Sequence, residues 1–137
     1  MKIAIINGPN LNLVGIREPE IYGNENMDTY MRRLIDTYSA HQFTYFQSNI
    51  EGEIINEIQV RGFDAEVIII NAGGYTHTSV AIADAVKAVP AMAIEVHLSN
   101  IYARESFRQQ SFLSPVCQGT ISGFGLKSYE LAILSLC

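Results

Sequence analysis

The feature that most limits how this chain can fold is a continuous apolar run, Val67, Ile68, Ile69 and Ile70. A second short apolar run, residues 3–6, opens the chain. Runs without polar alternation are typical of strands that are buried on both faces of a parallel sheet. Parallel pairing requires right-handed crossovers through helices, and helical periods do alternate with the strand-like runs. The sequence therefore predicts an α/β fold.

The alternation repeats about five times, with connections too short to hold a second domain. We expect one domain over residues 1–137 and a five-stranded parallel sheet in the order 2-1-3-4-5, with helices on both faces. The expected strands are 3–6, 43–46, 67–70, 91–96 and 116–122. The expected helices are 27–38, 50–62, 80–89, a short one that begins near 103, and 126–136.

Capping residues mark where several of these helices begin. Asn26 or Asp28 is expected to cap the first helix, and Asn49 the second. Thr76 or Thr78 is a candidate cap for the third helix. Each polar residue near a predicted helix start thus has a structural interpretation that competes with a functional one.

Composition and charge limit the partners and the compartment. The net charge of −5 comes without a basic patch, which argues against binding to nucleic acid or to an anionic membrane. No segment approaches the roughly 20 apolar residues that span a bilayer, and Met1 and Lys2 lead directly into the first strand, without a signal peptide. Cys117 and Cys137 lack metal-ligand spacing and are interpreted as free thiols. We therefore expect a cytoplasmic protein.

Polar residues follow the strands that flank the expected switch point of the sheet. Residues 7–12 (NGPNLN) end strand one, and residues 71–79 (NAGGYTHTS) end strand three. Ligands of open α/β sheets bind at this place, beyond the carboxyl ends of the strands. The two segments are therefore expected to form one crevice.

Several common site types are missing from the sequence. It contains neither a phosphate-binding loop nor a nucleophile elbow. Residues 123–128 (GFGLKS) carry two of the three dinucleotide-binding glycines and stand at the last strand. His41, His77 and His97 lack the spacing of metal ligands, so no metal or cofactor is expected.

An acid and a base remain as candidates for catalysis. His97 stands at the end of strand four, two residues after Glu95, and a free histidine with a pKa near 6.5 can supply a proton at neutral pH. Tyr22 is a poor base unless guanidinium groups such as those of Arg17 and Arg104 favour its phenolate. A lone histidine or tyrosine is more often structural, so only the coincidence of these residues points to chemistry.

Five ordered blocks of the chain closely resemble the type II 3-dehydroquinate dehydratase family. The resemblance covers essentially the whole length, in order. The blocks are residues 7–12, residues 17–19 with 22–23, residues 71–79, residues 95–105, and residues 111–115 with 119–129.

The resemblance implies a flavodoxin-like fold and a hydro-lyase of the shikimate pathway that uses neither metal nor cofactor. Its substrate would be 3-dehydroquinate and its product 3-dehydroshikimate. Tyr22 would remove the proton from carbon 2, Asn10 would stabilise the enolate through a bound water, and His97 would protonate the departing carbon-1 hydroxyl. Arg17 would sit on a lid, and Glu95 would orient His97.

The remaining site residues follow from the same resemblance. Arg104 would lower the pKa of Tyr22. The substrate-binding positions fall on Asn71, His77, Asp84, Leu98, Ser99 and Arg108.

The resemblance also implies a homododecamer built as a tetramer of trimers. In that assembly, Asp84 would reach the active site of a neighbouring subunit. Without the resemblance, Asp84 is interpreted as a solvated position on the third helix. The sequence departs from the family pattern at Ile50 and at Gln109 and Gln110, which bear on assembly more than on chemistry.

Three alternatives stay open at this point. The first is a flavodoxin-like module that binds a ligand without catalysis, and the second is a non-catalytic relative with a role in assembly. The third is an ester hydrolase that uses Ser79 or Ser99, which lack the surrounding elbow.

Overall fold

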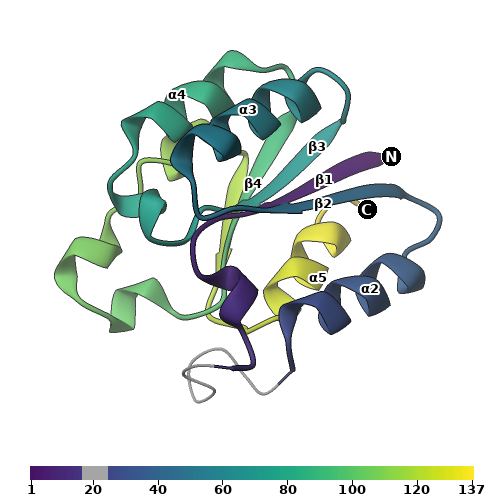
Figure 1. Cartoon of the computed structure of the whole chain (residues 1–137), viewed down its shortest axis with the longest axis horizontal. Helices are drawn as coiled ribbons and strands as arrows, with labels where there is room; N and C mark the ends of the chain where they lie inside the picture. Colours follow the sequence, from purple (N-terminus) through teal and green to yellow (C-terminus); the bar gives the residue numbers. More distant parts are fainter. Residues whose placement is uncertain (17–24) are drawn as a thin grey trace.

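A computed structural model describes residues 1–16 and 25–137, which build a sheet with helices on both faces (Figure 1). The strands are β1 (Lys2–Asn7), β2 (Gln42–Gln47), β3 (Val67–Asn71), β4 (Met92–His97) and β5 (Gly119–Ser122). The α-helices are α2 (Met27–Thr37), α3 (Glu51–Gly62), α4 (Val80–Ala88) and α5 (Lys127–Leu134). Figure 1 shows α3 and α4 on one face of the sheet and α2 and α5 on the other.

The sheet has the predicted order, β2-β1-β3-β4-β5, and all four pairings are parallel. The flavodoxin-like prediction is therefore confirmed. In the register between β1 and β3, Ile3 pairs with Val67 and Asn7 pairs with Asn71. Both strands thus end in an asparagine at the carboxyl end of the sheet. The two strands are neighbours, and the strand order reverses between them.

Alternate residues of the two central strands build two separate cores. Ile3 and Ile5 pack with α2 and α5 in one cluster, and Ala4 and Ile6 pack with α3 and α4 in the other. Every residue of β3 is buried, which accounts for its uninterrupted apolar run. Burial on both faces holds these strands rigidly and fixes where their polar ends lie.

Two predicted elements differ from the observed ones. The short helix expected near 103 is wrong, because the chain forms two 3-10 turns, η3 (Ile101–Ala103) and η4 (Ser106–Gln109), separated by the extended Arg104. The last strand begins at Gly119 rather than at 116, because Ser114–Val116 forms another 3-10 turn, η5, that contains Pro115.

The helix caps agree only in part with the prediction. Asn26 caps α2 as expected, since its Oδ1 accepts a hydrogen bond from the Thr29 amide at 2.8 Å. The cap predicted at Asn49 is wrong: the exposed Ile50 occupies that position, and Asn49 Oδ1 accepts instead from the Asn10 amide at 3.0 Å. Ser79 caps α4, through a bond from the Ile82 amide to its Oγ, in place of Thr76 or Thr78.

Within the described ranges 1–16 and 25–137, none of the helices combines the length and the apolar character that crossing a membrane would require.

Two glycines of α3 form a matched pair for testing the packing of α3 against the segment after α4. A Cβ added at Gly62 would lie 2.4 Å from Val89 Cβ, whereas one added at Gly52 would meet nothing within 4 Å. We predict that Gly62→Ala lowers the free energy of unfolding by about 1–3 kcal/mol because the core is overpacked. Gly52→Ala should leave it unchanged or raise it by up to about 1 kcal/mol through helix propensity. Urea unfolding measures the change in the free energy of unfolding for each variant. Equal changes in the two variants would contradict the close contact between Gly62 and Val89.

Candidate active site

The loops that follow β1 and β3 are joined at the switch point of the sheet. The Gly8 amide donates to the Asn71 carbonyl at 2.7 Å. A Cβ at position 8 would lie only 2.5 Å from the Ala72 carbonyl oxygen, so this close approach requires glycine. Gly73 has a φ of +59°, and a Cβ added there would lie 3.0 Å from the Pro9 carbonyl oxygen. The two polar segments predicted to converge therefore do so.

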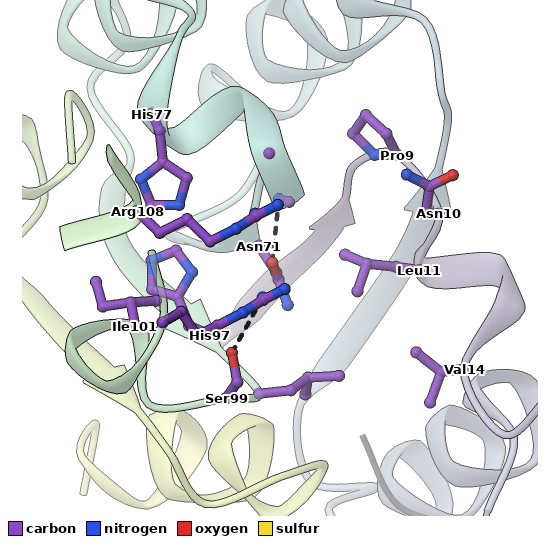
Figure 2. Close-up of a pocket in the computed structure, with 14 residues that line it drawn as sticks. Pro9, Asn10, Leu11, Val14, Asn71, His77, His97, Ser99, Ile101 and Arg108 are labelled. Atoms are coloured by element: carbon purple, nitrogen blue, oxygen red, sulfur yellow. Dashed lines mark hydrogen bonds between the residues drawn. The ribbon is translucent and has the colours of Figure 1, made fainter. Parts of the chain in front are cut away.

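Asn10 is held in a left-handed conformation with a φ of 70°, the one positive value among the described non-glycine residues. Its amide donates to Asn49 Oδ1, and its carbonyl accepts from the Leu13 amide. Asparagine tolerates this conformation better than other side chains do. The structure thus fixes Asn10 at the rim of the crevice (Figure 2).

A series of buried hydrogen bonds orients the side chain of Asn71 from the interior of the protein. Its Nδ2 donates to the Tyr129 hydroxyl at 3.1 Å, and that hydroxyl donates to Asn7 Oδ1 at 2.7 Å. Asn7 Nδ2 in turn donates to the Tyr45 hydroxyl. Burial raises the pKa of Tyr129 far above its usual range, so the hydroxyl keeps the proton that it donates. Sequence reasoning missed this role of Tyr129, because a tyrosine on an apolar helix face looks like core.

The crevice is a cavity of about 140 Å³. Eight of the predicted site residues line it: Asn10, Asn71, His77, His97, Leu98, Ser99, Arg104 and Arg108. The other lining residues are Pro9, Leu11, Val14, Gly73, Gly74 and Ile101. Figure 2 shows His77, His97 and Arg108 on one side of the cavity, facing Asn10 and Leu11 on the other.

Two cationic side chains line the cavity although the chain as a whole is acidic. Arg104 and Arg108 line it, and none of the described lining residues is acidic. Arg104 Nη1 donates to Ser99 Oγ at 3.4 Å, and Arg108 Nε donates to Glu105 at 3.2 Å. Guanidinium groups in a partly enclosed cavity favour an anionic ligand, such as a carboxylate.

His97 and Glu95 form a buried pair at the end of β4. Their exposed fractions are 5% and 0%, and His97 Nε2 lies 2.5 Å from Glu95 Oε2. A carboxylate can only accept, so His97 carries a hydrogen on Nε2 and leaves Nδ1 for a ligand. A hydrogen delivered at the cavity would therefore leave from Nδ1 of a doubly protonated His97, whose positive charge the Glu95 carboxylate stabilises.

Three hydroxyl groups also surround Glu95. Ser111 Oγ donates at 2.7 Å, Ser114 Oγ at 2.5 Å and Thr120 Oγ1 at 3.1 Å. Burial works to raise the pKa of Glu95, but the hydrogen bonds from His97, Ser114 and Ser111 outweigh it and lower that pKa below its usual range. Sequence reasoning did not assign these hydroxyls a role, because they lie 16 to 25 positions along the chain from Glu95.

His77 stands beside His97, with the ring centroids 6.2 Å apart and the planes 22° from parallel. Its Nδ1 donates to the Gln110 carbonyl at 2.7 Å. Burial, and then the neighbouring His97 and Arg108, lower the pKa of His77, which outweighs the opposite effect of the Gln110 bond. His77 is therefore neutral near pH 7 and presents Nε2 as an acceptor.

Of the four other predicted residues, Glu95 and Asp84 are described by the structure, and Glu95 contacts His97 without lining the cavity. Asp84 is exposed on α4 and does not line the cavity. Arg17 and Tyr22 lie outside the described residues. Their assignments stay predictions that rest on the sequence motifs.

The described residues, 1–16 and 25–137, contain no group of three or more His, Cys, Asp or Glu side chains arranged to hold a metal ion. The polar groups of the cavity are instead donors and acceptors suited to a small organic anion.

Comparison with known proteins agrees with this geometry. A family model described as dehydroquinase class II matches residues 1–137. The chain belongs to the class II dehydroquinase family. The family predicted from the sequence blocks is thereby confirmed.

Individual relatives are similar over nearly their whole lengths. A 3-dehydroquinate dehydratase of Nitratiruptor sp. is 51% identical over 99% of this chain and 88% of its own. A 3-dehydroquinate dehydratase of Caldicellulosiruptor saccharolyticus is 52% identical, over 98% and 95%. The crystal structure of a type II dehydroquinase from Butyrivibrio crossotus is 48% identical and superposes with a TM-score of 0.95, covering 99% and 97% of the two chains.

The protonation of His77 can be measured directly. We predict that nitrogen-15 NMR finds the hydrogen on Nδ1 and a pKa below 6.5. Because the folded state then binds fewer protons at His77 than the unfolded chain, this stabilisation is complete above the unfolded pKa and is lost as the pH falls through the folded pKa. His77→Gln should remove that part of the pH dependence of unfolding. A hydrogen on Nε2 in the neutral ring would contradict the assignment.

Proposed function

We propose that this chain is a type II 3-dehydroquinate dehydratase that converts 3-dehydroquinate to 3-dehydroshikimate and water. The observation that carries the proposal is the buried His97–Glu95 pair, which opens onto a cavity lined by two arginines. A cationic cavity with a proton donor suits a substrate that is a carboxylate and must lose a hydroxyl group. Relatives of about 50% identity over the whole chain bear that enzyme name.

The reaction begins with the removal of a proton from carbon 2, next to the ketone, and Tyr22 is the proposed base. The electron pair moves to the ketone oxygen and forms an enolate, which Asn10 stabilises through a bound water. The enolate then collapses, a double bond forms between carbons 1 and 2, and the carbon-1 hydroxyl departs. His97, doubly protonated and held at Nε2 by Glu95, transfers its Nδ1 hydrogen to that hydroxyl, so that water leaves and the ring keeps the hydrogen on Nε2.

Tyr22 needs a lowered pKa to act as a base at neutral pH. A shift of two to three units requires roughly 3–4 kcal/mol of preferential stabilisation of the phenolate. Arg17 and Arg104 are the proposed source, since nearby guanidinium groups favour an anion. Arg104 lines the cavity, which supports this proposal.

The remaining polar groups of the cavity are proposed to orient the substrate. The main-chain amides of Leu98 and Ser99 would hold its carboxylate, and Asn71, His77 and Arg108 would contact its ring hydroxyls. All five residues line the cavity. Asn71 has one amide hydrogen beyond the one given to Tyr129, and neutral His77 can accept at Nε2.

A non-catalytic flavodoxin-like module, for ligand binding or assembly, is the alternative function. Burying a carboxylate costs desolvation energy that a dedicated set of donors must offset, and a module without catalysis has no need for a histidine–carboxylate pair at a cavity wall. This pair therefore favours the enzyme over the module.

The wider setting is proposed from the same family membership. We infer a cytoplasmic enzyme of the shikimate pathway that assembles as a homododecamer from trimers. Asp84 would then serve the cavity of a neighbouring subunit, which accounts for its exposed position on α4. Ile50, one of the departures from the family pattern, is also exposed and does not line the cavity.

The proposed activity predicts that the purified protein converts 3-dehydroquinate to a product with the ultraviolet absorbance of an enone. Tyr22→Phe and His97→Gln should each lower kcat by about 10²- to 10⁴-fold, the usual contribution of a general base or acid. Tyr38→Phe is the matched control, because Tyr38 follows α2 at the opposite end of the sheet from the cavity. An inactive native protein would refute the function, and full activity of Tyr22→Phe would refute the mechanism.

The assembly predicts complementation between subunits. Asp84→Ala and His97→Gln oligomers should each be nearly inactive, but oligomers refolded from a mixture should regain activity. The reason is that some sites then combine His97 of one subunit with Asp84 of its neighbour. Asp36→Ala, an exposed change on α2, serves as the control. A light-scattering mass of a monomer, or no gain on mixing, would contradict the assembly.

A further inference from the structure

A single segment, residues 110–114, which runs from the end of η4 to the first residue of η5, contacts both His77 and the Glu95 partner of His97. We propose that this segment fixes which ring nitrogen carries the hydrogen on His77 and on His97, and that Ser111 and Ser114 are positioning residues that act on His97 through Glu95. The expected effects on kcat rest on the proposed function. The expected positions of the histidine hydrogens do not.

Ser111 has no freedom to turn its hydroxyl group elsewhere. Its Oγ accepts hydrogen bonds from the amides of Leu113 at 3.0 Å and Ser114 at 3.1 Å. Both lone pairs are thereby used, and the single hydroxyl hydrogen is directed to Glu95 Oε2 at 2.7 Å. His97 Nε2 approaches this same oxygen.

The other carboxylate oxygen is occupied in the same way. Ser114 Oγ lies 2.5 Å and Thr120 Oγ1 3.1 Å from Glu95 Oε1. A carboxylate offers about four acceptor positions, and four donors now fill them, two on each oxygen. No position is left where Glu95 could carry its own hydrogen, so the hydrogen shared with His97 resides on Nε2.

The same segment reaches His77 through its main chain. The Gln110 carbonyl accepts from His77 Nδ1, and the Phe112 amide donates to the Thr76 carbonyl at 2.9 Å, next to His77. Leu113 is buried at 1% exposure and anchors the segment in the core beside α4. The contact uses a carbonyl and not a side chain, so the glutamine that departs from the family pattern at 110 preserves it.

The result is a division of roles between two stacked rings. His77 keeps a free acceptor at Nε2. His97 keeps a hydrogen on Nε2 that points at the Glu95 carboxylate, whose acceptor positions are all filled by protein donors. Loss of a hydroxyl donor would leave the Glu95 carboxylate less stabilised, and Glu95 would compete for the hydrogen of His97. Segment 110–114 therefore acts on the acid without touching the substrate cavity itself.

The test uses Ser114→Ala, because this change removes a donor to Glu95 and leaves the turn held by Ser111 intact. We expect kcat to fall about tenfold or more, as for other partners that orient a histidine, with KM changed less than twofold. The low-pH limb of kcat should move to higher pH. Ser114→Thr, which keeps the hydroxyl, should restore kcat, and Ser39→Ala on the surface is the matched control.

Three titratable groups face Glu95 and bear on this shift. They are His97 on β4, His77 on the turn after β3, and Cys117, whose pKa burial raises to about 12 so that its thiol stays neutral. A shift of the limb in Ser114→Ala therefore reports on the Glu95–His97 pair.

Nitrogen-15 NMR of His97 provides a readout that does not depend on turnover. We expect a hydrogen on Nε2 in the native protein and a changed Nε2 signal in Ser114→Ala but not in Ser39→Ala. Native-like kcat, pH profile and His97 signals in Ser114→Ala would overturn the proposal. If the native protein fails to turn over 3-dehydroquinate while the His97 signals respond as expected, the proposed function fails and the positioning role stands.

Discussion

The buried charge of Glu95 is the interaction on which the rest of the site depends. Removing a carboxylate from water costs several kcal/mol unless donors replace the lost hydration. Here the imidazole of His97 and three hydroxyl groups do so. Because two of those hydroxyls come from residues 111 and 114, the chain between β4 and β5 must fold back onto β4. This connection contains 3-10 turns and no α-helix.

A second constraint acts at the switch point, where the loops after β1 and β3 approach too closely for any side chain at Gly8. The apolar strands β1 and β3, which lead into these loops, are buried on both faces, so they leave no room for the loops to move apart. The buried chain from Asn71 through Tyr129 to Asn7 then orients the amide of Asn71. The close approach at Gly8 and this buried chain together set the geometry of the cavity on this side.

Much of this arrangement could be predicted from the sequence. The run 67–70 indicated a central parallel strand, and the alternation of elements led to the correct strand order. His97 and Glu95 could be suspected because they end a strand. The cap at Asn49 and the helix near 103 were predicted wrongly, since local propensity does not register that Asn49 bonds to Asn10 or that the chain turns back toward Glu95.

The sequence by itself determined the fold class and the end of the sheet where the site lies, because apolar periodicity and strand ends are local properties of the chain; the family followed from the resemblance of five ordered blocks. Only the tertiary structure decided how the site is held. The hydroxyls of Ser111, Ser114 and Thr120 meet Glu95 across 16 to 25 positions of chain, and Tyr129 bridges Asn7 across 122. Such contacts follow from the packing of elements that are distant in the chain, and no local pattern encodes them.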